Sequence, residues 1–231
     1  MTSNALPSRT VLIVGYGRMG QLVESLAAEY GFDVAGVVRR ENAADHERWP
    51  VADVAIDFSV ADAVPANVPR LAARGMPIVV GTTGWQSHEE TVRDAVKTHG
   101  SAVVVAPNFS IGVNVFLAMV EKAGTLLADQ QYGGWIHELH HAAKRDAPSG
   151  TALALKAALE RGGFRGPLDV ASTRAGSIPG THTVGFDSPS DTITLTHVAR
   201  DRTGFARGSL EAARWVIGKR GWFSLKDVLG G

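Results

Sequence analysis

A glycine-rich loop near the N-terminus limits the fold of this 231-residue chain more than any other feature of the sequence. The loop follows an apolar run at residues 11–14 and leads into a stretch with helical periodicity. Its spacing is G-x-G-x-x-G, in which the first glycine allows a tight turn, the second lets the backbone approach a phosphate, and the third lets helix and strand pack closely. We therefore predict a dinucleotide-binding loop; the alternative is a turn that only connects strand to helix. The expected cofactor-binding residues are Gly15, Tyr16, Gly17, Arg18, Met19 and Gly20.

Short apolar runs alternate with polar helical stretches from residue 11 to about residue 108. Uninterrupted β-branched runs are typical of parallel strands covered on both faces, so the expected class is α/β with a Rossmann-like, doubly wound parallel sheet. After residue 112 the pattern changes to apolar helices and alternating strands, which predicts a smaller α+β domain with an open mixed sheet. The last stretch, residues 208–229, reads as an amphipathic helix followed by a short tail.

Two arginines, Arg39 and Arg40, stand where the second apolar strand ends. A site that prefers NADH places an acid there to bind the ribose hydroxyls, whereas a guanidinium suits the 2′-phosphate of NADPH. We expect NADPH to be preferred and NADH to be possible; the alternative is a solvated strand end. Further cofactor contacts are expected in two loops that follow later strands, at Gly81, Thr82 and Thr83 and at Ala106, Pro107, Asn108 and Phe109.

Residues 137–141 read His-Glu-Leu-His-His and match the H-E-x-x-H motif of zinc hydrolases. That motif works on a helix, where the two imidazoles share one face. Glycines precede this segment and a proline follows it closely, so a strand fits better and no metal is expected. On a strand, Glu138 and His140 face one way, and His137 and His141 face the other.

The next residues have the chemistry of an anion site. His140, His141 and Lys144 offer proton donors and cations, and a helical pattern begins shortly afterwards. Ser149 is the expected N-cap, which leaves the backbone N–H groups of Gly150 and Thr151 for a carboxylate. The alternative is a loop that two histidines and a lysine merely border.

Composition excludes several classes of chemistry. The chain has no cysteine, which removes thiolate nucleophiles and cysteine-ligated metals. Its formal net charge of zero gives no field that would gather nucleic acid or an anionic membrane surface. No apolar window is long enough to span a membrane, and residues 1–10 contain no basic segment leading into an apolar run, so we expect a cytoplasmic protein.

The run E-L-H-H-A-A-K-R-D-A-P-S-G-T-A at residues 138–152 resembles the hallmark of the 4-hydroxy-tetrahydrodipicolinate (dihydrodipicolinate) reductase family. The similarity extends to G-R-M-G, G-T-T-G, N-F-S-I-G-V-N-V, the G-T-H-T-V stretch around His182, and D-R-T-G-F-A-R-G. It implies NAD(P)H-dependent reduction of a small dicarboxylate in lysine biosynthesis by a cytoplasmic homotetramer. The implied domains are a dinucleotide-binding domain at 1–109, rejoined by 205–231, and a substrate-binding and oligomerisation domain at 110–204.

The resemblance also implies roles for individual residues. His140 and Lys144 fall on the catalytic histidine and the proton-donating lysine, His141 on a substrate contact, and Gly150 with Thr151 on the carboxylate clamp. The chain differs from most relatives by carrying Arg39 in place of an acid, by having one residue fewer between the first two glycines of the loop, and by a shorter region between residues 40 and 53. The rival interpretations are another nicotinamide oxidoreductase and a cofactor-sensing protein without turnover; semialdehyde dehydrogenases are excluded because they need a cysteine.

Overall fold

The computed structural model describes residues 9–230, and the chain divides into two units with separate cores. The first unit contains the chain up to Ser110 and from Thr203 onwards, and the second contains Ile111–Arg202. Residues 1–8, where the sequence lacks a basic segment leading into an apolar run, lie outside the described residues.

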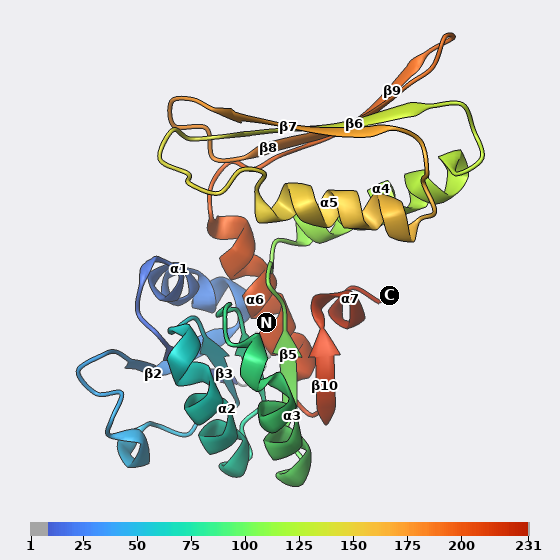
Figure 1. The fold of residues 1–231 in the computed structure, drawn as a ribbon. Helices are drawn as coiled ribbons and strands as arrows, with labels where there is room; N and C mark the ends of the chain where they lie inside the picture. The colour runs from blue at the N-terminus through green and yellow to red at the C-terminus, as the bar shows by residue number, and fades with distance from the viewer. Residues whose placement is uncertain (1–8, 231) are drawn as a thin grey trace, which may run out of the picture. The chain divides into compact units, whose positions relative to one another are not determined.

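The first unit is built on a six-stranded parallel sheet with the order β10-β5-β4-β3-β1-β2 (Figure 1). Since all strands run the same way, their carboxyl ends meet at one edge, where ligands bind in open α/β sheets. The strands are β1 (Arg9–Val14), β2 (Phe32–Val38), β3 (Val54–Asp57), β4 (Ile78–Val80), β5 (Ala102–Val105) and β10 (Gly221–Ser224).

Helices cover both faces of this sheet. Alternate strand residues contribute to two cores: Ile13 and Val104 belong to one, with residues of α6 (Thr203–Val216), and Leu12 and Val103 belong to the other, with residues of α2 (Val64–Ala73) and α3 (Glu89–Thr98). Helix α1 (Arg18–Ala27) packs beside α6. The doubly wound parallel sheet expected from the uninterrupted apolar runs is therefore confirmed. Short 3-10 turns complete the unit at Ala28–Tyr30, His46–Arg48, Ala61–Ala63 and Gln86–His88.

The C-terminal segment differs from its expected form. The amphipathic helix is present as α6, but the residues after it form β10, which pairs in parallel with β5, and then the short helix α7 (Leu225–Val228). The segment expected to be a short tail thus contains one of the two edge strands of the sheet. The shortened region after Arg40 contains turns and one 3-10 turn, with no α-helix or strand, before β3 begins.

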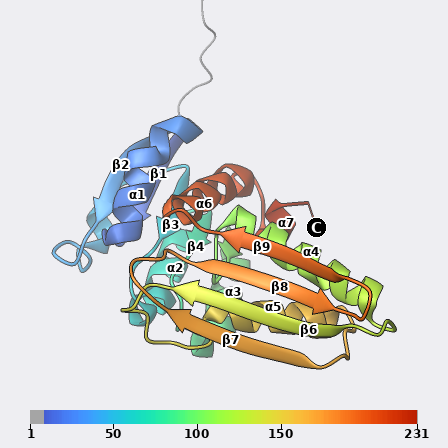
Figure 2. The ribbon, with the colours of Figure 1, turned by 90° about the horizontal axis from the view of Figure 1, so that it is seen from above.

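The second unit is an open, four-stranded mixed sheet with the order β7-β6-β8-β9, shown face-on in Figure 2. Its strands are β6 (Gly133–His140), β7 (Leu168–Arg174), β8 (Thr181–Asp187) and β9 (Thr192–Val198). β6 runs parallel to β7 and antiparallel to β8, and β8 is antiparallel to β9. Helices α4 (Ile111–Leu127) and α5 (Gly150–Arg161) lie together against one face. This is the mixed sheet that the alternating pattern predicted.

The helices in the described part of the chain include none that is long and apolar enough to cross a membrane.

Candidate functional site

The inner face of the second sheet changes from apolar to polar along β6. Ile136 and its cross-strand partner Val184 are fully buried in the core under α4 and α5. Two residues further on, Glu138 pairs with His182 of β8, which in turn pairs with His197 of β9. The row of polar side chains therefore lies on the same covered face as the core, directly beyond its apolar part.

The strand conformation of residues 133–140 decides between the two interpretations of the histidine-rich segment. Alternate residues of β6 are buried, among them Glu138 and His140, and the residues between them are only partly buried. His137 Nε2 lies 2.9 Å from Thr173 Oγ1, on the opposite face from His140. The predicted strand is confirmed, and the helical H-E-x-x-H geometry is absent from this segment.

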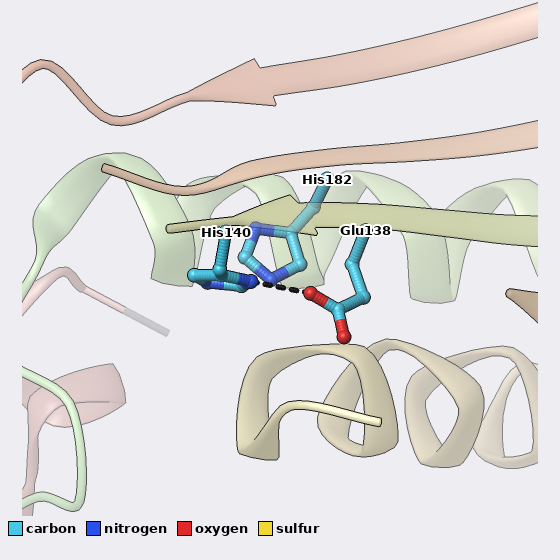
Figure 3. Close-up of side chains that lie close together, drawn as sticks. All are labelled: Glu138, His140 and His182. Atoms are coloured by element: carbon cyan, nitrogen blue, oxygen red, sulfur yellow. Dashed lines mark hydrogen bonds and ion pairs between the residues drawn. The ribbon is translucent and has the colours of Figure 1, made fainter. Parts of the chain in front are cut away.

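Glu138 is the centre of the polar cluster, and its side chain is fully buried. Arg174 donates to both carboxylate oxygens, over 2.6 Å from Nη2 and 3.0 Å from Nη1, and the Ser149 N–H donates over 3.2 Å. Glu138 also forms a short hydrogen bond with Nδ1 of His140, drawn in Figure 3. Burial raises the pKa of Glu138, but hydrogen bonds from Arg174, Ser172 and His140 outweigh it and lower the pKa to about 2.

His182 lies edge-to-face with His140, with 5.0 Å between the ring centroids. Its Nε2 is 3.1 Å from Ser149 Oγ, and its buried Nδ1 has no hydrogen-bond partner among the described residues. Burial, followed by the nearby His140, lowers the pKa of His182 to about 4. This imidazole is therefore neutral at neutral pH.

The loop after β6 carries the remaining predicted residues. Lys144 Nζ contacts both carboxylate oxygens of Asp146, at 2.7 and 2.9 Å, and this contact lowers the pKa of Asp146. Ser149 is the N-cap of α5, as expected, because its Oγ accepts from the Ala152 N–H. His141 and Thr151 are partly buried, and Gly150 is exposed. The end of β6, one loop and the start of α5 thus carry six of the predicted residues: His140, His141, Lys144, Ser149, Gly150 and Thr151.

Sequence reasoning missed three members of the cluster as functional residues. The alternation of β6 places Glu138 on the same face as His140, and this signal was present in the sequence. Arg174 and His182 come from β7 and β8, and only the register of the sheet brings them to Glu138.

Three side chains of this cluster could in principle be metal ligands. Glu138, His140 and His182 each present a ligand atom, and these atoms lie within 4.8 Å of one another. Both oxygens of Glu138 already accept from the Arg174 guanidinium, however, so a cation would have to displace another cation. We therefore interpret the cluster as a hydrogen-bonded network.

The glycines of residues 15–20 differ in what surrounds them in the first unit. Gly15 has φ +89°, and a Cβ there would lie 2.5 Å from the Phe58 carbonyl oxygen. A Cβ on Gly20 would lie 2.2 Å from the Gly15 carbonyl oxygen, so α1 packs closely on the loop. Around Gly17 no described atom beyond its chain neighbours lies within 4 Å of that position. Gly17 is also the N-cap of α1 and offers no capping side chain, so the space and the N–H groups needed for a phosphate are present.

Arg39 directly follows β2, and its guanidinium carbon lies 4.1 Å from the centroid of the Tyr16 ring. A hydrogen bond from the Tyr16 hydroxyl to Glu24 of α1 holds that ring. Arg40 is exposed. The structure thus brings one of the two predicted arginines to the glycine loop, while Arg18 is exposed and Met19 is partly buried.

Two further loops follow β4 and β5 at the same carboxyl edge. The Thr82 hydroxyl is 2.9 Å from the Asp57 carboxylate, and Phe109 is buried edge-on against Phe58, 6.3 Å between centroids. These two side chains therefore have partners within the protein. Ala106 is buried, Asn108 and Gly81 are partly buried, and Thr83 and Pro107 are exposed.

Family models match nearly the whole chain. The model for the N-terminus of dihydrodipicolinate reductase matches residues 9–109, and the model for its C-terminus matches residues 112–229. Two curated relatives are named 4-hydroxy-tetrahydrodipicolinate reductase. The protein from Christiangramia forsetii is 36% identical and the match covers 95% of this chain and 97% of the relative; for the protein from Acidiphilium cryptum the values are 39%, 93% and 94%.

A solved structure has the same fold. It is a dipicolinate-bound dihydrodipicolinate reductase from Paenisporosarcina sp. TG-14, with a TM-score of 0.78 at 18% sequence identity. The match covers 94% of this chain and 97% of the other.

Proposed function

The chain belongs to the dihydrodipicolinate reductase family, and from that premise we propose that it reduces 4-hydroxy-tetrahydrodipicolinate to tetrahydrodipicolinate with NAD(P)H, in the diaminopimelate route to lysine. The observation that carries the proposal is that both family models match and that residues 138–152 form one hydrogen-bonded site.

The second unit supplies the substrate site. One carboxylate of the substrate binds to the N–H groups of Gly150 and Thr151 at the N-terminus of α5, beside the ammonium group of Lys144. His141 and the Ser149 hydroxyl provide further contacts. Lys144 exchanges its Asp146 partner for the substrate or shares it. The related structure with bound dipicolinate, a planar dicarboxylate, supports this class of ligand.

The first unit supplies the cofactor site. The open space at Gly17 and the uncapped N-terminus of α1 fit a pyrophosphate, with Gly15, Tyr16, Arg18, Met19 and Gly20 around it. Gly81–Thr83 and Ala106–Phe109 lie at the same sheet edge, where they contact the nicotinamide half. Arg39, held over Tyr16, and Arg40 bind the 2′-phosphate, so NADPH is preferred over NADH.

The residues of the second unit handle the proton. When bound, the nicotinamide supplies a hydride to the substrate ring, from which water is lost. Lys144 and the His140 imidazole are the proton-bearing groups of the site, and this pair supplies the proton that completes the product. The cationic surroundings stabilise the negative charge that develops on the ring nitrogen and carbons after hydride addition.

The proposal also includes an oligomeric state and a cellular compartment. We expect a homotetramer, and light scattering of the purified protein tests it directly. We also expect the enzyme to act in the cytoplasm, which cell fractionation tests.

The function is tested by following NADPH oxidation at 340 nm with freshly generated dihydrodipicolinate synthase product. We predict turnover that depends on that product, with a higher kcat/KM for NADPH than for NADH. Saturable NADPH binding without turnover would contradict the reductase assignment and favour a cofactor-sensing protein. Turnover of other substrates only would favour a different nicotinamide oxidoreductase, and a higher kcat/KM for NADH would overturn the role given to Arg39.

A further inference from the structure

Glu138 links every part of the proposed substrate site in the second unit. It contacts the His140 ring directly and accepts from the Ser149 N–H at the start of α5. Its partner Arg174 also donates from Nη2 to the Asp146 carbonyl oxygen, over 2.6 Å, and the Asp146 side chain contacts Lys144. One buried carboxylate thus connects the strand end, the loop and the helix N-terminus.

The chemistry of these contacts determines which ring nitrogen of His140 carries hydrogen. Each Glu138 oxygen accepts from one Arg174 nitrogen, so the carboxylate is ionised and can only accept. The hydrogen bond at Nδ1 therefore requires an N–H at that nitrogen. In the neutral ring Nε2 is then the basic atom, and it takes up or releases the proton.

Nε2 of His140 lies next to Gly180, the residue directly before β8. A Cβ on Gly180 would lie 3.0 Å from Nε2, so a side chain at residue 180 would press on it. Gly180 has φ +149°, a conformation that L side chains rarely adopt. The glycine at residue 180 thus leaves room for Nε2, while Nδ1 is directed to Glu138.

We propose that Glu138, held by Arg174, is the positioning residue that fixes the orientation and the Nδ1–H tautomer of His140. This inference rests on the proposed function only in one respect, namely that Nε2 of His140 takes part in proton transfer to the substrate. Second-layer carboxylates that hold the tautomer of a working histidine have this role in other enzymes.

The variant Glu138→Gln has a distinct expected effect. Each carboxylate oxygen of Glu138 has two partners, and only the His140 ring can change from donor to acceptor. The amide oxygen is therefore best placed at the Oε1 position, where it accepts from Arg174 Nη2 and the Ser149 N–H, and the amide nitrogen takes the Oε2 position, next to Arg174 Nη1. The amide nitrogen then faces Nδ1 of His140, which must become an acceptor, so the hydrogen moves to Nε2. We expect kcat to fall about 10- to 100-fold, with KM for the substrate changed less than about threefold.

Nitrogen-15 NMR of the histidine rings tests the tautomer without any turnover. In the unmodified protein above the titration range of the ring we expect Nδ1 of His140 protonated and Nε2 unprotonated, and in Glu138→Gln the reverse. Peaks are assigned with His140→Gln. A wild-type ring with hydrogen on Nε2 would overturn the proposal even if Glu138→Gln fails to fold.

The matched control is Glu121→Gln, which removes a carboxylate that is 3.0 Å from Arg161 Nη2 on the exposed surface of the same unit. It should leave kcat and the His140 spectrum unchanged. The expected spectra together with an inactive wild-type protein would refute the proposed function and leave the positioning role intact. Unchanged spectra and unchanged kcat in folded Glu138→Gln would refute the positioning role alone.

Discussion

The surroundings of two ionisable residues beside His140 have different effects: one residue, Glu138, is ionised and the other, His182, is neutral. Glu138 is buried with Arg174 and stays ionised, whereas burial and the neighbouring His140 outweigh the attraction of the Glu138 carboxylate and keep His182 neutral. Neutral His182 therefore adds no charge to a cluster whose charged members are paired, Glu138 with Arg174 and Lys144 with Asp146.

The neutral state of His182 makes the stability of the second unit sensitive to acid. Its pKa is about 4 in the folded chain against an ordinary value of 6.5, so between these values the unfolded chain binds more protons. The free energy of unfolding should therefore fall as the pH falls from about 6.5 to about 4, by about 3 kcal/mol at most. Urea denaturation at a series of pH values measures this.

Substitution separates the contribution of His182 from that of other groups. His182→Gln should flatten the profile between pH 6.5 and 4, while His99→Gln, which changes an exposed histidine, should not. Glu138 contributes in a lower window, because its pKa is lowered from 4.5 to about 2 and its stabilisation is lost as the pH falls through that range. A profile for His182→Gln as steep as that of the wild type would contradict the neutral assignment.

At the scale of elements, two glycines of the loop have different roles: Gly20 is required for packing, and Gly17 is proposed to bind the cofactor. Gly20 faces protein at a distance that admits no Cβ, whereas Gly17 has φ −79° and faces open space. An alanine at residue 17 therefore fits the backbone but takes up the space that we propose for a phosphate.

Two alanine substitutions in this loop should therefore fail in different ways. Gly17→Ala should keep the wild-type melting temperature and weaken NADPH binding about tenfold or more, which corresponds to roughly 1.4 kcal/mol. Gly20→Ala should lower the free energy of unfolding by about 1–3 kcal/mol, because the new Cβ would lie against the Gly15 carbonyl. Calorimetry and cofactor titration measure both. Unchanged NADPH affinity in folded Gly17→Ala would show that Gly17 has no binding role.

Strands with strong local patterns could be predicted, and strands that depend on distant partners could not. The glycines before residue 135 and the proline after residue 141 predicted a strand there, with Ile136 and Glu138 on one face, and β6 has that form. The four residues of β10 follow a basic turn and have no pattern of their own, and they become a strand because the edge of β5 is available for pairing. The element that sequence analysis missed was therefore specified by tertiary contacts.

At the scale of the whole molecule, each unit holds one half of the proposed chemistry. The glycine loop and the 138–152 segment are each a single short stretch of sequence, so a role for each could be inferred from its local motif. Arg174 lies 36 residues from Glu138 and Asp57 lies 25 residues from Thr82, and both contacts depend on sheet register. Sequence analysis accordingly identified the residues proposed to touch ligands better than the residues that hold them.

The central claim is that His140 and Lys144 do the chemistry of the second unit while the first unit binds cofactor independently of them. The most direct measurement is kcat together with NADPH affinity for His140→Gln and Lys144→Met. Controls are His137→Gln, on the opposite face of β6, and Lys156→Met, on the exposed side of α5. We predict that kcat falls by about 100-fold or more in both variants, with NADPH affinity within about twofold of wild type and the controls unaffected. A kcat within about threefold of wild type in either folded variant would contradict the account.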